Sequence, residues 1–284
     1  MLDKDLHTKY IYVEGYKIRY LDFGYDQNYN DNDNYSQLIK EKHNKKVLVL
    51  LHDILLTSES WLTVVPELSK YYRIIIPDLI GFGYSDKPHL DYTFYFSINF
   101  LKKFLKLLNI SDVNIIGSSD GGLLALEYAI NYGSEVEKLV LVSPTGTMRY
   151  VSTTLKHYTG MALYPTYENI SRILQQMIYA PKMISETLIY DLINRMNLPN
   201  SKYAFMSTLM SFNNHHTLTD RLNIDVPTLI IWGRNDQVNP VHYAKKFKIP
   251  NSKIALLDKC GHYPHIEKPL EFSNIVLNFI KLNN

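Results

Sequence analysis

The chain has 284 residues, 46% of them hydrophobic and 13% aromatic, which is enough for one buried core plus an accessory lobe and excludes a disordered protein. With 30 basic and 28 acidic residues, its net charge of +2 gives no reason to expect nucleic acid binding or integral membrane association. No stretch approaches the roughly 18 apolar residues of a membrane span, and the single Cys260 cannot form an internal disulfide, so we expect a cytoplasmic monomer or homodimer.

The first predicted elements form a β-hairpin. Two runs with strand character, residues 9–14 and 17–23, are joined by a short turn that contains Gly15. After them, residues 25–46 are rich in Asn and Asp and show no apolar period, which is typical of a surface insertion. We expect no function for this insertion.

Short apolar runs then alternate with helical patterns. Continuous runs of Val, Ile and Leu are what a parallel sheet covered on both faces requires. The predicted strands are residues 47–51, 73–76, 113–116, 138–142, 228–232 and 253–257. The predicted helices are residues 59–70, 96–108, 123–132 and 269–282. The alternation predicts an α/β fold with a mostly parallel, doubly wound sheet.

One long interval breaks this alternation. Residues 147–220 contain no strand pattern, but they contain amphipathic helical runs separated by prolines. The runs cover residues 167–179, 185–196 and 202–212. We expect them to form a helical cap over the carboxyl edge of the sheet. The predicted core therefore consists of residues 1–146 and 221–284, and the predicted cap of residues 147–220.

A candidate nucleophile lies in the stretch Gly117-Ser118-Ser119-Asp120-Gly121. A strand that runs directly into a helix through G-x-S-x-G needs a tight turn, and glycines at both ends leave room for the strand and helix to approach each other. Only the central residue of such a turn projects above the sheet, which nominates Ser119. The alternative is a glycine and serine turn without chemistry.

A serine nucleophile needs two partners. Its hydroxyl is weakly reactive unless a neutral imidazole accepts the proton, and a carboxylate must orient that imidazole. Asp236 follows the predicted strand 228–232, and His262 follows the predicted strand 253–257. Either residue alone could be an ordinary loop residue. Because all three candidates stand at strand ends, the sequence predicts a catalytic triad of Ser119, His262 and Asp236.

Several segments together resemble the α/β-hydrolase superfamily over residues 10–282, apart from the insertion. The matching segments are Leu50-Leu51-His52, Trp61, PDLIGFGYSDKP at 77–88, the GSSDGG elbow, IIWGRND at 230–236 and GHYPHIEKP at 261–269. The resemblance implies the α/β-hydrolase fold with Ser119 as nucleophile, His262 as general base and Asp236 as its orienting carboxylate, in the usual chain order. It also explains the spacing of His262, His265 and Glu267, so we expect no metal and no cofactor.

Two further carboxylates lie near the expected oxyanion. Where family members usually have His-Gly, this chain has His52-Asp53; by analogy the oxyanion donors are the N–H groups of Ile54 and Asp120. Negative charge at Asp53 and Asp120 would oppose the charge that grows in the transition state. One explanation is a cationic substrate group, because valacyclovirase-type amino-ester hydrolases share the Ser-Asp-Gly-Gly elbow. The other is that Asp120 faces solvent or stabilises the start of the following helix.

The predicted cap is similar to that of meta-cleavage-product hydrolases, which break carbon–carbon bonds. Those enzymes typically have an asparagine before the nucleophile, a cap arginine and a tryptophan after the histidine, whereas this chain has Ser118, Leu192 and Tyr263 there. We therefore expect a serine hydrolase that cleaves small to medium carboxylic esters, a small-molecule substrate. Carbon–carbon bond hydrolysis and a ligand receptor without turnover are the alternatives.

Overall fold

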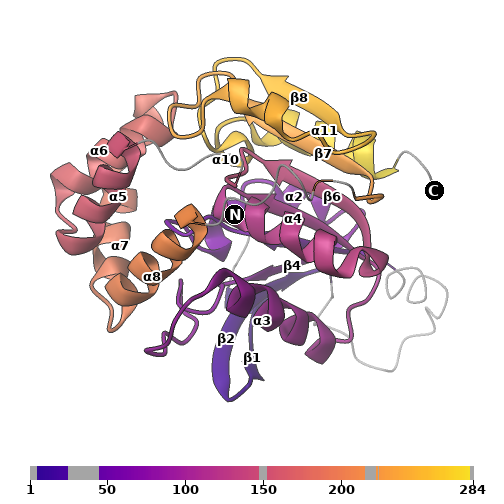
Figure 1. Ribbon diagram of the computed structural model, residues 1–284, viewed down its shortest axis with the longest axis horizontal. Helices are drawn as coiled ribbons and strands as arrows, with labels where there is room; N and C mark the ends of the chain where they lie inside the picture. Colours follow the sequence, from indigo (N-terminus) through magenta and orange to yellow (C-terminus); the bar gives the residue numbers. More distant parts are fainter. Residues whose placement is uncertain (1–4, 25–44, 147–151, 215–221, 223, 282–284) are drawn as a thin grey trace.

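The core of the protein is an eight-stranded sheet with the order β1-β2-β4-β3-β5-β6-β7-β8 (Figure 1). The computed structural model describes residues 5–24, 45–146, 152–214, 222 and 224–281. The strands are β1 (Thr8–Val13), β2 (Tyr16–Phe23), β3 (Val47–Leu51), β4 (Arg73–Pro77), β5 (Val113–Ser118), β6 (Val136–Val142), β7 (Thr228–Gly233) and β8 (Lys253–Leu257).

The strand pairing confirms the predicted fold class. Strands β1 and β2 form an antiparallel hairpin, and β2 pairs antiparallel with β4. All pairings from β4 through β3, β5, β6 and β7 to β8 are parallel. Parallel strands place their carboxyl ends at one edge of the sheet, so the loops that follow β3, β5, β7 and β8 gather at that edge.

Helices cover both faces of the sheet. Successive residues of a strand point to opposite faces: in β3, Val49 and Leu51 pack in the cluster that contains α3 (Phe94–Leu107) and α4 (Asp120–Tyr132). Leu48 and Leu50 pack in the cluster that contains α2 (Val65–Leu68) and α11 (Pro269–Lys281). All four side chains are fully buried. The continuous apolar runs of the sequence therefore reflect burial on two faces.

The cap helices gather at one side of the molecule (Figure 1). They are α5 (Ser152–Leu163), α6 (Tyr167–Met177), α7 (Glu186–Met196) and α8 (Ser201–Asn214). Their apolar side chains form a third cluster that includes Ile54, Phe82 and Tyr263 of the core. This shared burial fixes the cap against the loops that follow β3, β4 and β8.

The remaining elements are short. They are the 3-10 turns η1 (Asp5–His7), η2 (Ser58–Trp61), η3 (Gly133–Glu135), η4 (Pro181–Met183) and η5 (Val241–Lys246), and the one-turn helix α10 (Pro264–Glu267).

One helix prediction was wrong, and one helix was not predicted. The single helix predicted over residues 59–70 is instead η2 followed by the one-turn α2. Pro66 stands in the first turn of α2, where its missing N–H and fixed φ suit a helix start but not a helix interior. Helix α5 was not predicted, because its Thr, Tyr and Gly residues are modest helix formers without a clear apolar stripe. The predicted insertion lies outside the described residues, except for Lys45 and Lys46.

Candidate active site

Ser119 occupies the turn between β5 and α4. Its backbone has φ 53° and ψ −115°, a conformation that costs energy for a residue with a side chain. A Cβ added at Gly121 would lie 2.5 Å from the carbonyl oxygen of His52, and one added at Gly117 would collide with the backbone of Gly121. The glycines therefore permit the close crossing of strand and helix that holds Ser119 in place.

The side chains of Ser119, His262 and Asp236 form a hydrogen-bonded row. His262 Nε2 lies 2.9 Å from Ser119 Oγ, and His262 Nδ1 lies 2.7 Å from Asp236 Oδ2. The other oxygen of Asp236 accepts the N–H groups of Val238 and Asn239, each at 2.9 Å. Since these bonds fix the carboxylate, the imidazole is held with Nε2 toward the serine. This arrangement permits proton transfer from Ser119 to His262.

Nearby charges control the protonation of His262. Burial alone would lower the pKa of His262, because it disfavours the charged imidazolium, but the carboxylates of Asp236, Asp53 and Asp120 raise it above its ordinary value. His262 and Ser119 are both fully buried. The imidazole is therefore surrounded by carboxylates that stabilise its protonated form.

His52 holds the loop after β3. Its Nε2 accepts the N–H of Leu79 at 3.0 Å, so its Nδ1 carries the proton and donates it to the carbonyl oxygen of Asp53 at 2.7 Å. Burial lowers the pKa of His52, which agrees with a neutral ring. The carbonyl of Asp53 also accepts the N–H of Leu56 at 3.0 Å. A trans peptide directs its N–H opposite to its C=O, so the N–H of Ile54 points away from these bonds and meets no acceptor within the described part of the chain.

Asp53 carries a buried carboxylate oxygen at the site. Its Oδ1 accepts the N–H of Leu55 at 2.6 Å. Its Oδ2 is buried, lies 3.9 Å from His262 Nε2, and has no hydrogen-bond partner within 3.5 Å among the residues that the structure describes. Burial, followed by the charge of Asp53, raises the pKa of the neighbouring Tyr263 well above its ordinary value. Tyr263 is therefore a neutral hydroxyl beside this carboxylate.

Asp120 also faces inward. Asp120 is only 1% exposed, and its Oδ1 accepts a hydrogen bond from the hydroxyl of Thr145 at 3.0 Å. The alternative in which Asp120 faces solvent is therefore wrong. The residue is the first of α4, where a negative charge is favoured by the helix dipole. Thr145 was not predicted as a site residue, because this contact joins the loops after two neighbouring strands.

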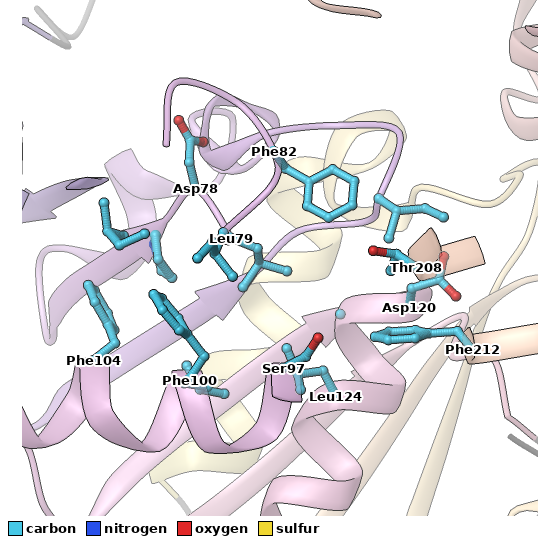
Figure 2. A pocket seen from close by; sticks show the side chains of 16 residues that line it. Asp78, Leu79, Phe82, Ser97, Phe100, Phe104, Asp120, Leu124, Thr208 and Phe212 are labelled. Carbon is cyan, nitrogen blue, oxygen red and sulfur yellow. The ribbon is translucent and has the colours of Figure 1, made fainter. Parts of the chain in front are cut away.

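A small cavity of about 30 Å³ borders Asp120 and Ile54. Figure 2 shows Asp120 and Thr208 at one end of it and Phe104 at the other, with Phe100 between them. The wall is largely apolar and is built from β4, α3, α4 and α8 together with the loops that follow β3 and β4.

The cap is bonded to the loop that carries His262. Glu267 accepts the N–H of Gly261 at 2.9 Å and the N–H of Tyr179, just beyond α6, at 2.8 Å. The N–H of His262 itself bonds to the carbonyl of Met177 at 2.6 Å. The end of α6 and the loop that carries His262 therefore share one set of hydrogen bonds.

A cap arginine approaches the core, although sequence comparison pointed to Leu192 at that place. Leu192 is buried in the apolar cluster of the cap, whereas Arg195 donates to Thr57 Oγ1 at 3.0 Å and pairs with Asp191. Residues three apart lie on the same face of a helix. This i,i+3 relation to Leu192 is the signal that could have indicated Arg195.

His265 does not join a metal cluster. It stacks on Trp61 with ring centroids 4.0 Å apart, and burial lowers its pKa to about 3, so the ring is neutral. Across the described ranges, no three His, Cys, Asp or Glu side chains come together in a way that could hold a metal ion. In the same ranges, no helix has both the length and the apolar character needed to cross a membrane.

Comparison with known proteins identifies the family. The sequence profile of the alpha/beta hydrolase fold matches residues 46–178 and 186–269, which is more than half of the chain. The chain belongs to the alpha/beta hydrolase family. This alpha/beta hydrolase is similar to the meta-cleavage product hydrolase CumD of Pseudomonas fluorescens, with a TM-score of 0.84, 25% identity, and 98% of this chain and 100% of that chain covered.

Two sequence relatives of this alpha/beta hydrolase have different activities in their names. The 2-hydroxy-6-oxo-2,4-heptadienoate hydrolase of Pseudomonas putida is 28% identical over 230 residues, which cover 78% of this chain and 83% of that protein. The monoacylglycerol lipase ABHD6 of Homo sapiens is 28% identical over 255 residues, which cover 83% of this chain and 75% of that protein. The family is thus established, while its relatives include hydrolases of both C–C and ester bonds.

Proposed function

We propose that this alpha/beta hydrolase cleaves small to medium carboxylic esters through an acyl-enzyme. The observation that carries the proposal is the row in which His262 Nε2 lies 2.9 Å from Ser119 Oγ and Nδ1 lies 2.7 Å from Asp236. Ser119 Oγ attacks the ester carbonyl while His262 accepts its proton, and Asp236 stabilises the imidazolium. His262 then gives the proton to the leaving alcohol, and water attacks the acyl-enzyme with His262 again as base.

Two backbone N–H groups are proposed to bind the oxyanion. The fixed peptide between Asp53 and Ile54 turns the N–H of Ile54 away from His52, and the N–H of Asp120 directly follows the nucleophile in the chain. Donors that are already oriented lose little free energy to reorganisation when charge develops on the carbonyl oxygen. Loss of the usual glycine at position 53 therefore leaves a loop that still supports this role.

Substitution of the nucleophile tests the proposal. Ser119→Ala should abolish labelling by a fluorophosphonate probe and turnover of p-nitrophenyl butyrate, because it removes the hydroxyl that bonds to His262 Nε2. Ser118→Ala is the matched control, since Ser118 is also buried but is bonded to neither His262 nor Asp236. Unchanged labelling of Ser119→Ala would disprove the assignment. A single slow turnover with retained ligand would instead favour a ligand receptor.

Carbon–carbon bond hydrolysis is the second candidate. It is favoured by the 28% identity to a 2-hydroxy-6-oxo-2,4-heptadienoate hydrolase and by a cap arginine, Arg195, next to the loop after β3. Against it stand Ser118 and Tyr263, where such enzymes usually have asparagine and tryptophan. A kcat/KM for a ring-fission dienoate that exceeds the value for every ester in a panel would favour this candidate over ours.

Asp120 is proposed to bind a cationic group of the substrate. Its buried carboxylate lies at the end of the cavity beside the proposed nucleophile, where a cationic substrate group would gain Coulomb attraction. Amino-acid esters should therefore be hydrolysed faster than their des-amino analogues, and Asp120→Asn should remove that preference while des-amino esters are still cleaved. Equal kcat/KM values for the two ester types in the wild-type protein would refute this role.

A further inference from the structure

We infer that Asp53 binds and orients the water molecule that releases the acyl group from Ser119, so that hydrolysis is favoured over transfer of the acyl group to an alcohol. This inference rests on the proposed ester hydrolysis and adds how its second step selects the acceptor. It is carried by the buried Oδ2 of Asp53, which lies 3.9 Å from His262 Nε2 and has no hydrogen-bond partner in the described part of the chain.

The carboxylate of Asp53 is held in one orientation. Its Oδ1 accepts the N–H of Leu55 at 2.6 Å, and the residue is only 1% exposed. Oδ2 therefore stays on the side of His262. The neighbouring hydroxyl of Tyr263 donates to Met177 Sδ at 3.1 Å. A buried acceptor that lacks a donor is costly, and a bound water molecule commonly supplies the missing hydrogen bond.

The spacing of the two acceptors suits one water molecule. Nδ1 of His262 faces Asp236 at 2.7 Å, so the neutral ring offers its lone pair at Nε2. A water oxygen about 2.8 Å from both Nε2 and Asp53 Oδ2 would see these acceptors, 3.9 Å apart, at an angle of about 90°. Each of its two O–H bonds can then point closely at one acceptor. Nε2 also lies 2.9 Å from Ser119 Oγ, so this place adjoins the acyl group that Ser119 would carry.

Both hydrogens of this water have a defined place in the second step. The water oxygen forms a bond to the acyl carbonyl carbon while one proton passes to His262 Nε2, and the other hydrogen stays directed at Asp53 Oδ2. The tetrahedral oxyanion then collapses, the bond between the carbonyl carbon and Ser119 Oγ breaks, and His262 returns its proton to Oγ. The product is a carboxylic acid that keeps the second hydrogen until it ionises.

An alcohol cannot use Asp53 in this way. It has one hydroxyl hydrogen, which His262 must accept, so Oδ2 gains no hydrogen bond from it. The charge of Asp53 acts on the imidazolium and on the oxyanion alike whether water or an alcohol attacks. Only the bond to the second hydrogen differs between the two acceptors. Because hydrogen bonds to charged groups are the stronger ones, we expect this bond to favour water about tenfold.

Partition of the acyl-enzyme between water and methanol tests the inference. The protein turns over p-nitrophenyl butyrate at a fixed methanol concentration, above the acid limb of every variant, and the initial rates of methyl butyrate and butyrate formation are compared. Asp53→Asn should raise the ratio of methyl butyrate to butyrate about tenfold. Its amide oxygen can keep the bond to the N–H of Leu55, which turns a donor, and no acceptor, toward His262.

A second variant and a matched control complete the test. Asp53→Ala removes the acceptor outright and should shift the ratio in the same direction, so it serves if Asp53→Asn does not fold. Asp120→Asn is the control, because the charge of Asp120 also raises the pKa of His262 while its Oδ1 is bonded to Thr145. Its product ratio should equal that of the wild-type protein.

The product ratio separates water binding from a purely structural effect. Displacement of His262 in the Asp53 variants would slow both products together and leave their ratio unchanged. The inference is overturned by an unchanged ratio in the Asp53 variants that fold, or by an equal rise in Asp120→Asn. A wild-type protein that releases no p-nitrophenol from the ester would instead refute the proposed function itself.

Discussion

His262 has a carboxylate near each of its ring nitrogens. Asp236 bonds to Nδ1 at 2.7 Å, and Asp53 Oδ2 lies 3.9 Å from Nε2. Catalysis needs the neutral imidazole, whereas both carboxylates favour the imidazolium, so the raised pKa of His262 places the loss of activity on acidification at a higher pH than for an ordinary histidine.

Removal of the Asp53 charge should therefore extend activity to lower pH. In Asp53→Asn, the pKa of His262 falls because one stabilising anion is lost, and the acid limb of the kcat/KM profile should move downward. The profile is measured with a neutral ester between acidic and neutral pH. Asp258→Asn is the control, because that carboxylate is 80% exposed and pairs with Arg234. An acid limb at the same pH in Asp53→Asn and wild type would contradict the assignment.

The candidate site residues at the strand ends could be predicted from the sequence, but the hydrogen bonds that hold the loops around them could not. Ser119, Asp236 and His262 stood out because each directly follows an apolar strand pattern. The function of His52 in fixing the Asp53 carbonyl depends on a bond to Leu79, at the end of a different strand. Such a bond leaves no periodic pattern in the chain.

At the scale of elements, the crossing of β5 and α4 determines the position of Ser119, the proposed nucleophile. A Cβ at Gly121 would lie 2.5 Å from the carbonyl oxygen of His52 and 2.6 Å from that of Leu51, and backbone atoms cannot move aside as a flexible side chain can. Gly121→Ala should lower the free energy of unfolding by about 3 kcal/mol or more. Urea denaturation followed by circular dichroism measures the change.

A second glycine provides the comparison. Gly160 lies inside α5, and a Cβ there would meet nothing within 4 Å. Gly160→Ala should raise the free energy of unfolding by about 0.5–1 kcal/mol, because alanine loses less conformational entropy in a helix. Equal effects of the two substitutions would show that close approach at the elbow does not limit stability.

Among the elements, strands were easier to predict than cap helices. Because a parallel strand is buried on both faces, its residues form a continuous apolar run, as in β3 and β7. A cap helix buries one stripe against other helices, so its pattern is weaker. Helix α6 has such a stripe in Ile170, Ile173, Leu174 and Met177 and was predicted, whereas α5 was not.

At the scale of the whole molecule, Glu267 joins the cap to the loop that carries His262. It accepts N–H groups from Gly261 on the core side and from Tyr179 on the cap side. Glu267→Ala leaves both donors without their acceptor, which should lower the free energy of unfolding by about 1–3 kcal/mol. It should also lower kcat, because the position of His262 depends on the same loop.

Urea denaturation and ester turnover measure both effects. Glu271→Ala is the control, since Glu271 is an exposed residue of the neighbouring α11, and exposed substitutions usually change stability by less than about 0.5 kcal/mol. A Glu267→Ala variant with wild-type stability and kcat would show that the cap and the catalytic loop are held by their apolar contacts alone.

The buried thiol close in sequence to His262 has a practical consequence. Cys260 is the single cysteine of the chain; it is fully buried, and burial raises its pKa, so its sulfur is protonated and shielded. An alkylating reagent can react with it only during excursions that expose the segment leading to His262. The rate of alkylation in the native protein therefore measures how often the loop that carries His262 opens.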